Sequence, residues 1–241
     1  MASKNYALIF WVDGITNMLA GLLLLMVLPK KPKSSTTISR DSGLPSPPST
    51  SAYKDKIYLL FIVMVILFAF GFFQIFTILP LYLTTQLGLS EGKYGILMTI
   101  NGLLIALLEM VLVFKLEKSL NSLRFIAVGT FLMGISYAMY NVIPGAFLVA
   151  FISTLTITFG EMLSMPFMNT FWISRSSDNN RGQYAALYTM GWGIAQITGP
   201  FTGGWIANHY GFASLWWTIL AIMTIASVGF YKLTDKKYFA S

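Results

Sequence analysis

The sequence predicts an all-α membrane protein with seven transmembrane helices. Of its 241 residues, 56% are hydrophobic and 10% are charged, a balance that leaves a soluble domain of this size with too little polar surface. Apolar stretches long enough to cross a bilayer core of about 30 Å recur along the whole chain. Basic residues gather in alternate gaps between these stretches, as expected for a chain that crosses a membrane repeatedly.

Each apolar stretch is expected to be helical, because lipid offers the backbone no hydrogen-bond partners. The expected spans are residues 6–28, 57–83, 94–116, 123–140, 145–173, 183–207 and 214–231. Residues 29–56 are rich in proline, serine and threonine, and we expect them to form a flexible cytoplasmic linker. The other connections are short, which makes consecutive helices antiparallel neighbours. The expected organisation is one helix (1–28), the linker (29–56), a six-helix bundle (57–231) and a tail (232–241).

The positive charges predict the orientation of the chain. Of the 16 lysines and arginines, all except Lys4 and Lys93 follow the first, third, fifth or seventh span. Positively charged loops stay in the cytoplasm, so we expect the N-terminus outside the cell and the C-terminus in the cytoplasm. The expected location is the cell membrane, either a plasma membrane or an inner membrane. This distribution also accounts for the net charge of +7 without a nucleic-acid partner.

Sequence signatures of enzymes and metal sites are missing. The chain has no cysteine, and its single histidine, His209, is expected in an outer loop, so we expect no metal site. Neither a nucleotide-binding glycine loop nor a nucleophile elbow occurs, so we expect neither enzymatic activity nor a cofactor. A heptahelical receptor or retinal protein is a remote alternative, since residues 214–231 lack the lysine that retinal needs.

Three acidic residues fall inside the expected spans, at Asp13, Glu109 and Glu161. A carboxylate inside a bilayer is costly, so it is usually retained for a partner or a function. At about 1.5 Å per residue, Glu109 and Glu161 lie about 22 and 24 Å from the outer ends of their helices and can share one layer, whereas Asp13 lies about 10 Å deep. Burial favours the neutral carboxyl, so each is a candidate for proton coupling. Fixed contacts with Arg175, Arg181 or helix N-termini, which would hold a cytoplasmic gate, are the alternative.

Polar side chains within the spans are candidates for a substrate cavity. They are Gln74, Thr77, Asn101, Asn169 and Gln196. Such groups either bond across helices or contact a substrate. The neighbouring phenylalanines and methionines suit an adaptable apolar pocket: Phe72, Phe73, Phe76, Met162, Met165 and Met168.

Small residues recur at every fourth position along residues 183–207. They are Gly191, Ala195, Gly199, Gly203 and Ala207. They give this span one smooth face that another helix can approach closely. Pro200 is expected to bend the helix and to free a backbone carbonyl.

Four short segments carry a family resemblance: residues 160–169 (GEMLSMPFMN), 181–184 (RGQY), 199–204 (GPFTGG) and 10–14 (FWVDG). The first three resemble helices ten and eleven of major facilitator superfamily transporters of the drug and proton antiporter type, and the fourth resembles their sixth helix. A set within the sixth span resembles the glycine-proline motif of the antiporters' fifth helix, the repeat counterpart of the eleventh: Ala195, Gly199, Pro200, Gly203 and Gly204.

The loop at residues 115–124 stands where the superfamily repeats its gating motif. The glycine of that motif is missing, and Glu117 remains with Lys118 and Arg124. These residues, with Arg175 and Arg181, are candidates for a cytoplasmic gate. Ordinary positive-inside charge is the alternative explanation for the loop.

The resemblance implies that this chain is the sixth helix and the C-terminal half of a twelve-helix transporter, with the first five helices missing. Such a protein moves small drug-like or amphipathic molecules by alternating access and is driven by a proton gradient. The implied partners are the lipid bilayer, the substrate and the missing N-terminal half. A peptide or sugar carrier of the same fold is one alternative. An inactive or regulatory half-transporter is another.

Overall fold

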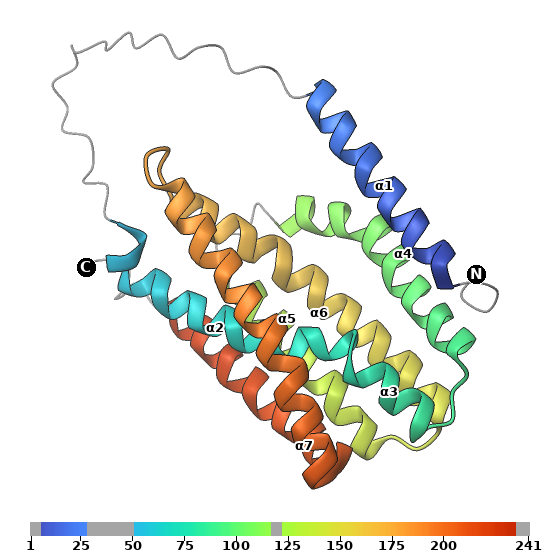
Figure 1. Cartoon of the computed structure of the whole chain (residues 1–241). Helices are drawn as coiled ribbons and strands as arrows, with labels where there is room; N and C mark the ends of the chain where they lie inside the picture. Colours follow the sequence, from blue (N-terminus) through green and yellow to red (C-terminus); the bar gives the residue numbers. More distant parts are fainter. Residues whose placement is uncertain (1–5, 28–50, 117–121, 235–241) are drawn as a thin grey trace, which may run out of the picture. The chain divides into compact units, whose positions relative to one another are not determined.

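The computed structural model describes residues 6–27, 51–116 and 122–234, and nearly all of them are helical. The helices are α1 (Tyr6–Val27), α2 (Lys56–Phe72), α3 (Ile78–Thr85), α4 (Glu91–Leu116), α5 (Ser122–Val142), α6 (Ala146–Arg175) and α7 (Arg181–Lys232), with short 3-10 helices η1 (Ala52–Lys54) and η2 (Phe73–Ile75) on either side of α2 (Figure 1). Five apolar segments within these residues are long enough to cross a membrane. The all-α membrane fold expected from the sequence is therefore confirmed.

The chain divides into two units, Met1–Ser46 and Pro47–Ser241. The first unit contains the apolar helix α1, which corresponds to the first expected span. Asp13 lies in α1, but its side chain is outside the described part of the structure. Residue 28, most of the expected linker (29–50) and the tail from residue 235 are also outside it.

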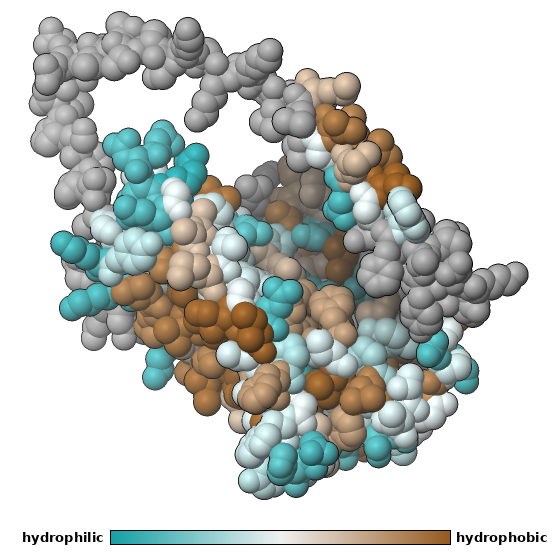
Figure 2. All heavy atoms as spheres, in the orientation of Figure 1, coloured by the Kyte–Doolittle hydropathy of each residue, from teal (hydrophilic) through white to brown (hydrophobic). Residues whose placement is uncertain are grey.

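The second unit contains the remaining spans. Helices α2, η2 and α3 follow one another as a single apolar segment, Lys56–Thr85, and α4, α5 and α6 each form one span. Figure 2 shows hydrophobic side chains across the middle of this unit and hydrophilic ones gathered at its two ends, as a bilayer requires.

Helix α7 combines the last two expected spans. A straight helix of 52 residues would be about 78 Å long, far more than a bilayer needs. Gly211 interrupts it with a φ of 81° and a ψ of 163°, a conformation open to glycine because it has no Cβ. Figure 1 shows the orange and red parts of α7 folding back from this bend. The break falls between the expected spans at 183–207 and 214–231.

Two glycines allow α5 and α6 to approach closely. A Cβ atom added at Gly129 would lie 2.6 Å from the Gly160 carbonyl oxygen, and one added at Gly160 would lie 2.8 Å from the Gly129 carbonyl oxygen. The rings of Phe125 and Phe167 extend this contact, with their centres 5.0 Å apart. Small residues are favoured at such contacts because apolar side chains gain little by leaving lipid, so dense packing must hold the helices together.

A second close contact joins α7 to α2. Gly191, Ala195, Gly199 and Gly203 are all buried on one face of α7. A Cβ at Gly191 would lie 3.4 Å from Ile62, and one at Gly199 would lie 3.1 Å from the Phe70 carbonyl oxygen. Ala207 is partly buried against the core, and Gly204 and Pro200 continue the same segment of helix.

A charged network joins three helix ends at the side of the bundle expected to be cytoplasmic. Arg175, at the end of α6, donates from Nε to Asp55 Oδ2 at 2.5 Å and from Nη2 to Oδ1 at 2.8 Å. The Tyr184 hydroxyl, from the first turns of α7, donates to Asp55 Oδ2 at 2.8 Å. Asp55 also caps α2 by accepting the Tyr58 backbone N–H at 3.1 Å.

This network differs from the sequence expectation for residues 29–56. Within the last six residues of the expected flexible linker, Ala52 is fully buried and Gln183 accepts hydrogen bonds from Ser51 Oγ (3.1 Å) and the Ala52 N–H (3.2 Å), so this end of the linker contacts the bundle. Burial raises the pKa of Asp55, but the hydrogen bonds from Arg175, Tyr58 and Tyr184 and the charge of Arg175 outweigh it, so this pKa lies below its ordinary value of 3.8.

We expect Gly129→Ala to destabilise the bundle by about 1–3 kcal/mol, because the new methyl group would overlap the backbone of α6. The measurement is the thermal unfolding midpoint of the purified protein in detergent. Gly193→Ala is the matched control, since a Cβ at that position meets no atom within 4 Å. Equal midpoints for the two variants would contradict a tight contact at Gly129.

We expect Asp55→Asn to cost about 2 kcal/mol at pH 7, because the variant leaves Arg175 without its charged partner. A carboxyl whose pKa is lowered by folding stabilises the protein above its unfolded value of 3.8 and loses this effect as the pH falls through the folded value. The difference in unfolding midpoint between the parent and Asp55→Asn should therefore be full at pH 7 and shrink below about pH 3.8.

Asp178→Asn is the control for this pair. Asp178 forms an ion pair with Arg181 at 3.1 Å, but its side chain is 92% exposed, so its loss should change the midpoint little at any pH. A gap between the parent and Asp55→Asn that stays constant down to pH 3 would rule out the ion pair as its source.

Candidate functional site

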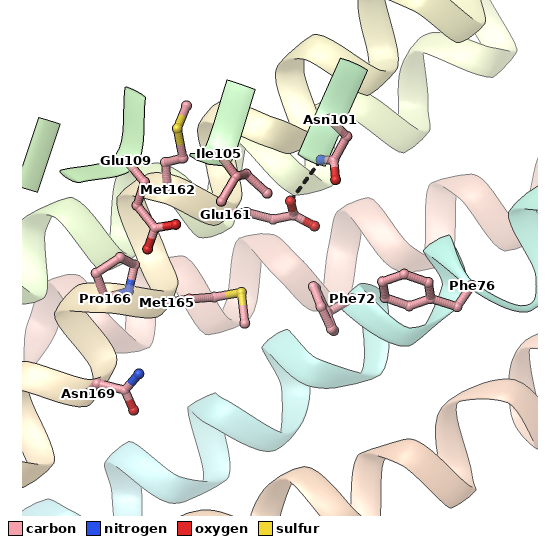
Figure 3. A pocket seen from close by; sticks show the side chains of 10 residues that line it. All are labelled: Phe72, Phe76, Asn101, Ile105, Glu109, Glu161, Met162, Met165, Pro166 and Asn169. Carbon is pink, nitrogen blue, oxygen red and sulfur yellow. Dashed lines mark hydrogen bonds between the residues drawn. The ribbon is translucent and has the colours of Figure 1, made fainter. Parts of the chain in front are cut away.

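A cavity of about 340 Å³ lies among α2, α4 and α6 (Figure 3). Its lining combines carboxylates, amides and large apolar side chains: Phe72, Phe76, Asn101, Ile105, Glu109, Glu161, Met162, Met165, Pro166 and Asn169. Two of the three acidic candidates from the sequence therefore meet in one place.

The helical repeat explains how α4 and α6 present these residues. Asn101, Ile105 and Glu109 are four residues apart and share one face of α4. On α6, Glu161 and Met165 share the face toward the cavity, while the neighbouring Gly160 lies on the face that contacts α5. The glycine contact with α5 thus fixes the rotation of α6 that directs Glu161 into the cavity.

Glu161 is 5% exposed, although it lines an open cavity. The Asn101 side-chain amide donates to Glu161 Oε2 at 2.9 Å and also approaches Thr158 Oγ1 at 2.9 Å. The Thr158 hydroxyl donates in turn to the Thr154 carbonyl at 2.8 Å. In the described part of the chain, neither of the two ion pairs involves Glu161. Its carboxylate is therefore held by an uncharged donor.

Glu109 lies on α4, two turns beyond Asn101, and is half-buried. Figure 3 shows Glu109 and Glu161 directed into the same cavity from different helices. The depths estimated from the sequence placed them in one layer, and the structure brings them into one lining. The cavity therefore contains two carboxylates in a largely apolar lining.

The apolar part of the cavity comes from aromatic rings and thioethers. Phe72 and Phe76 lie with their ring centres 5.4 Å apart, and Met162 and Met165 line the cavity from α6. Phe73 and Met168, which the sequence also suggested, are not part of this lining. Unbranched methionines adapt to ligands of different shape.

The other polar candidates are placed differently. Asn169 lines the cavity and its side-chain oxygen accepts the Trp172 indole N–H at 3.2 Å. Gln74, Thr77 and Gln196 are outside this lining. Gln74 is fully buried and donates to the Gly199 carbonyl at 2.8 Å, and the Thr77 hydroxyl donates to the Phe73 carbonyl at 2.8 Å. Gln74 thus joins η2 to the glycine face of α7.

The gate candidates are also dispersed. Arg175 pairs with Asp55 and Arg181 with Asp178, so neither arginine is an ion-pair partner of Glu161 or Glu109. Arg124 is exposed on α5, and Glu117 and Lys118 lie outside the described residues. Sequence reasoning missed Asp55, although an aspartate directly before a span is a recognisable helix cap. Among the described residues, no group of three or more potential metal ligands occurs.

Three relatives can be compared with the chain. It is 29% identical to a Na(+), Li(+), K(+)/H(+) antiporter from Planococcus maritimus, in a match that covers 68% of this chain and 45% of the relative. It is 27% and 22% identical to the uncharacterized MFS-type transporters YttB and YqjV of Bacillus subtilis (strain 168), with 64% and 84% of this chain and 38% and 49% of the relatives covered. The matches thus span about half the length of these curated relatives. No solved structure matches the chain.

A family model also matches most of the chain. Residues 1–190 match the family model described as Major Facilitator Superfamily. This match covers α1 to α6 and the start of α7, and it includes all the residues that line the cavity. The heptahelical-receptor alternative is thereby excluded, and the chain belongs to the Major Facilitator Superfamily.

Proposed function

We propose that this chain is one half of a proton-coupled secondary transporter and supplies one wall of its substrate pathway. The observation that carries the proposal is Glu161, a carboxylate 5% exposed in an open cavity within a span and held by the neutral donor Asn101. A second helical half, acting as partner in the cell membrane, completes the site, and the two halves alternate access around it. The proton gradient supplies the energy.

The partner of Glu161 distinguishes it from an acid with a purely structural role. Asn101 donates a hydrogen bond to the charged carboxylate, and it can also donate to the carbonyl oxygen of the protonated carboxyl. Asp55 differs, because its protonation would leave the Arg175 guanidinium without a counter-charge. Glu161 therefore tolerates both protonation states, as a coupling residue must, whereas Asp55 is suited to hold helix ends together.

Asn101 also connects the protonation state of Glu161 to the contact between two helices. It bonds to Glu161 and Thr158 and thereby links α4 to α6 across the cavity. A change in the charge of Glu161 alters the strength of this link, because hydrogen bonds to charged groups are stronger than those to neutral ones. Protonation of Glu161 therefore changes how strongly α4 is held to α6. Glu109, also on α4, lines the same cavity.

An amphipathic organic cation fits the cavity best. Phe72, Phe76, Met162 and Met165 provide adaptable apolar contacts, and Glu161 and Glu109 provide negative charge. The volume of about 340 Å³ lies at the lower end of small-molecule sites, as expected for one wall of a larger pathway. A cation and a proton would compete for the same carboxylates, and this competition couples their movements as antiport. Since the lining contains no lysine or arginine, it gives little support to an acidic or peptide carboxylate substrate.

Exchange of monovalent metal cations for protons is the second candidate. It is supported by the name of the Planococcus maritimus relative and by the oxygen atoms that Glu109, Glu161, Asn101 and Asn169 bring to one cavity. Hard cations prefer carboxylate and amide oxygens. The apolar residues of the lining have no role in this alternative. Substitutions of those residues can therefore distinguish the two candidate functions.

We expect Glu161→Gln to abolish substrate-driven proton movement while leaving membrane insertion intact, because glutamine keeps the shape and the hydrogen bond but cannot bind and release a proton at this position. The measurement is proton flux, followed with a pH-sensitive dye, in membrane vesicles of source cells that carry the substitution in the native gene. Immunoblotting checks the amount of protein in the membrane. Glu91→Gln, at the exposed start of α4, is the control and should retain flux.

The same vesicles test the proposal against its alternatives. Unchanged flux in Glu161→Gln would remove this residue from the coupling role. Absence of flux in the parent protein with organic cations, Na⁺, K⁺ and Li⁺ alike would favour an inactive or regulatory half-transporter instead.

We expect Phe72→Ala combined with Met165→Ala to reduce transport of hydrophobic organic cations by about tenfold or more, because the variant removes apolar contacts from the lining. Proton exchange with Na⁺ or K⁺ should change little, since it needs only the oxygens. Met110→Ala, on a residue of α4 that is 78% exposed and outside the lining, is the control. If organic cations drive no flux in the parent while Na⁺ or K⁺ does, the metal-cation alternative is the function.

A further inference from the structure

A second hollow lies away from the cavity, between α5 and the C-terminal part of α7. It is a groove of about 270 Å³. Val128, Phe131, Val228 and Tyr231 form its exposed rim. Its lining shares no residue with the cavity among α2, α4 and α6, so it has no place in the proposed transport mechanism.

The lining of this groove contains no charged side chain. Ala127, a small residue, forms part of it, and the Ser227 hydroxyl donates to the Ala127 carbonyl at 2.7 Å. This bond uses the only hydroxyl proton of Ser227. The groove therefore offers an apolar surface, which suits a hydrocarbon chain better than a polar solute.

One end of the groove is basic. Arg124 precedes Ala127 by three residues on α5, and Lys232 follows Ser227 by five residues on α7. Because these two helices cross the membrane in opposite directions, both residues lie toward the same end, about 5 and 8 Å beyond the Ser227–Ala127 bond along their helices. Both are exposed, and by the positive-inside rule this end is cytoplasmic.

Tyr231 is placed to mark the boundary between the two regions. It belongs to the rim of the groove, directly precedes Lys232 and is 59% exposed. Tyrosine favours the level of lipid headgroups, where its ring contacts acyl chains and its hydroxyl reaches water. The groove thus changes from apolar to aromatic to basic over the last turn of α7.

We propose that this groove is a binding site for an anionic phospholipid of the cytoplasmic leaflet. One acyl chain lies against Val128, Phe131 and Val228, and the phosphate is bound by Arg124 and Lys232. Basic residues at the cytoplasmic ends of neighbouring transmembrane helices bind anionic headgroups, and a guanidinium binds phosphate through two hydrogen bonds. The proposal commits to a lipid, because a free phosphate would make no use of the apolar groove.

The test is lipid retention measured by native mass spectrometry on the purified full chain, together with the shift of its thermal unfolding midpoint on lipid addition. The probes are phosphatidylglycerol, phosphatidylcholine with the same acyl chains, and glycerol phosphate. We expect the chain to retain phosphatidylglycerol at least tenfold better than phosphatidylcholine and to bind glycerol phosphate weakly. This comparison needs no variant, so it does not depend on any substitution folding correctly.

Two pairs of variants locate the site. Arg124→Gln with Lys232→Gln should remove the preference for phosphatidylglycerol, whereas Lys54→Gln with Lys56→Gln removes the same charge from exposed residues elsewhere on the cytoplasmic side and should preserve it. Val128→Phe, which narrows the groove, should weaken retention of both lipids.

Three results would overturn the proposal. The first is equal retention of the two lipids by the parent chain. The second is an equal loss of the preference for phosphatidylglycerol in the two double variants, and the third is binding of glycerol phosphate as strong as that of phosphatidylglycerol. The last result would identify an anion site without a lipid chain.

Discussion

The contact between Gly129 and Gly160 determines the geometry of the rest of the bundle. Apolar side chains gain little by moving from lipid to a neighbouring helix, so the helices are positioned where their backbones can approach most closely. Gly160 directs one face of α6 toward α5. Glu161 is the next residue, about 100° further round the helix, and so faces α4 and the cavity. One requirement for a small residue thereby sets the position of the one buried carboxylate among the described residues of the spans.

The two best-defined acids of the structure illustrate opposite uses of a carboxylate. Asp55 lies at the end of a span, is bound twice by a guanidinium and receives two further hydrogen bonds. Each of those partners favours its charged form, so the pKa of Asp55 is lowered and the carboxylate is ionised at neutral pH. Glu161 lies within a span and has a neutral amide as its partner. The first arrangement holds α2, α6 and α7 together, and the second permits a change of charge without the loss of a counter-ion.

Hydropathy predicted the spans well because lipid leaves the chain no alternative to the helix. It separated the last two spans correctly, but it could not show that a single non-helical residue, Gly211, joins them in place of a longer loop, since this depends on one backbone conformation. For the site, the depth of Glu109 and Glu161 followed from the helical rise, but their partners did not. The contact between Asn101 and Glu161 and that between Asp55 and Arg175 depend on the rotation of whole helices, and close packing at glycines sets that rotation. For the same reason Gln74, a cavity candidate from its sequence position, instead joins η2 to α7.

Helix α4 is the least buried span of the bundle, and this bears on the proposed transport. Only 6% of its apolar span is buried, compared with 28% for α7, 50% for Lys56–Thr85 and for α6, and 56% for α5. Gly95 and Gly102 on α4 have no atom near the position of a Cβ, so the helix retains space for a close neighbour. Among the described contacts of α4, the bonds from Asn101 to Glu161 and Thr158 are the polar ones that reach α6. Under the proposed role of Glu161, this helix combines the smallest buried share of the bundle's spans with an attachment that responds to a proton. Within the proposed function, α4 is therefore the element best placed to convert the charge state of Glu161 into movement.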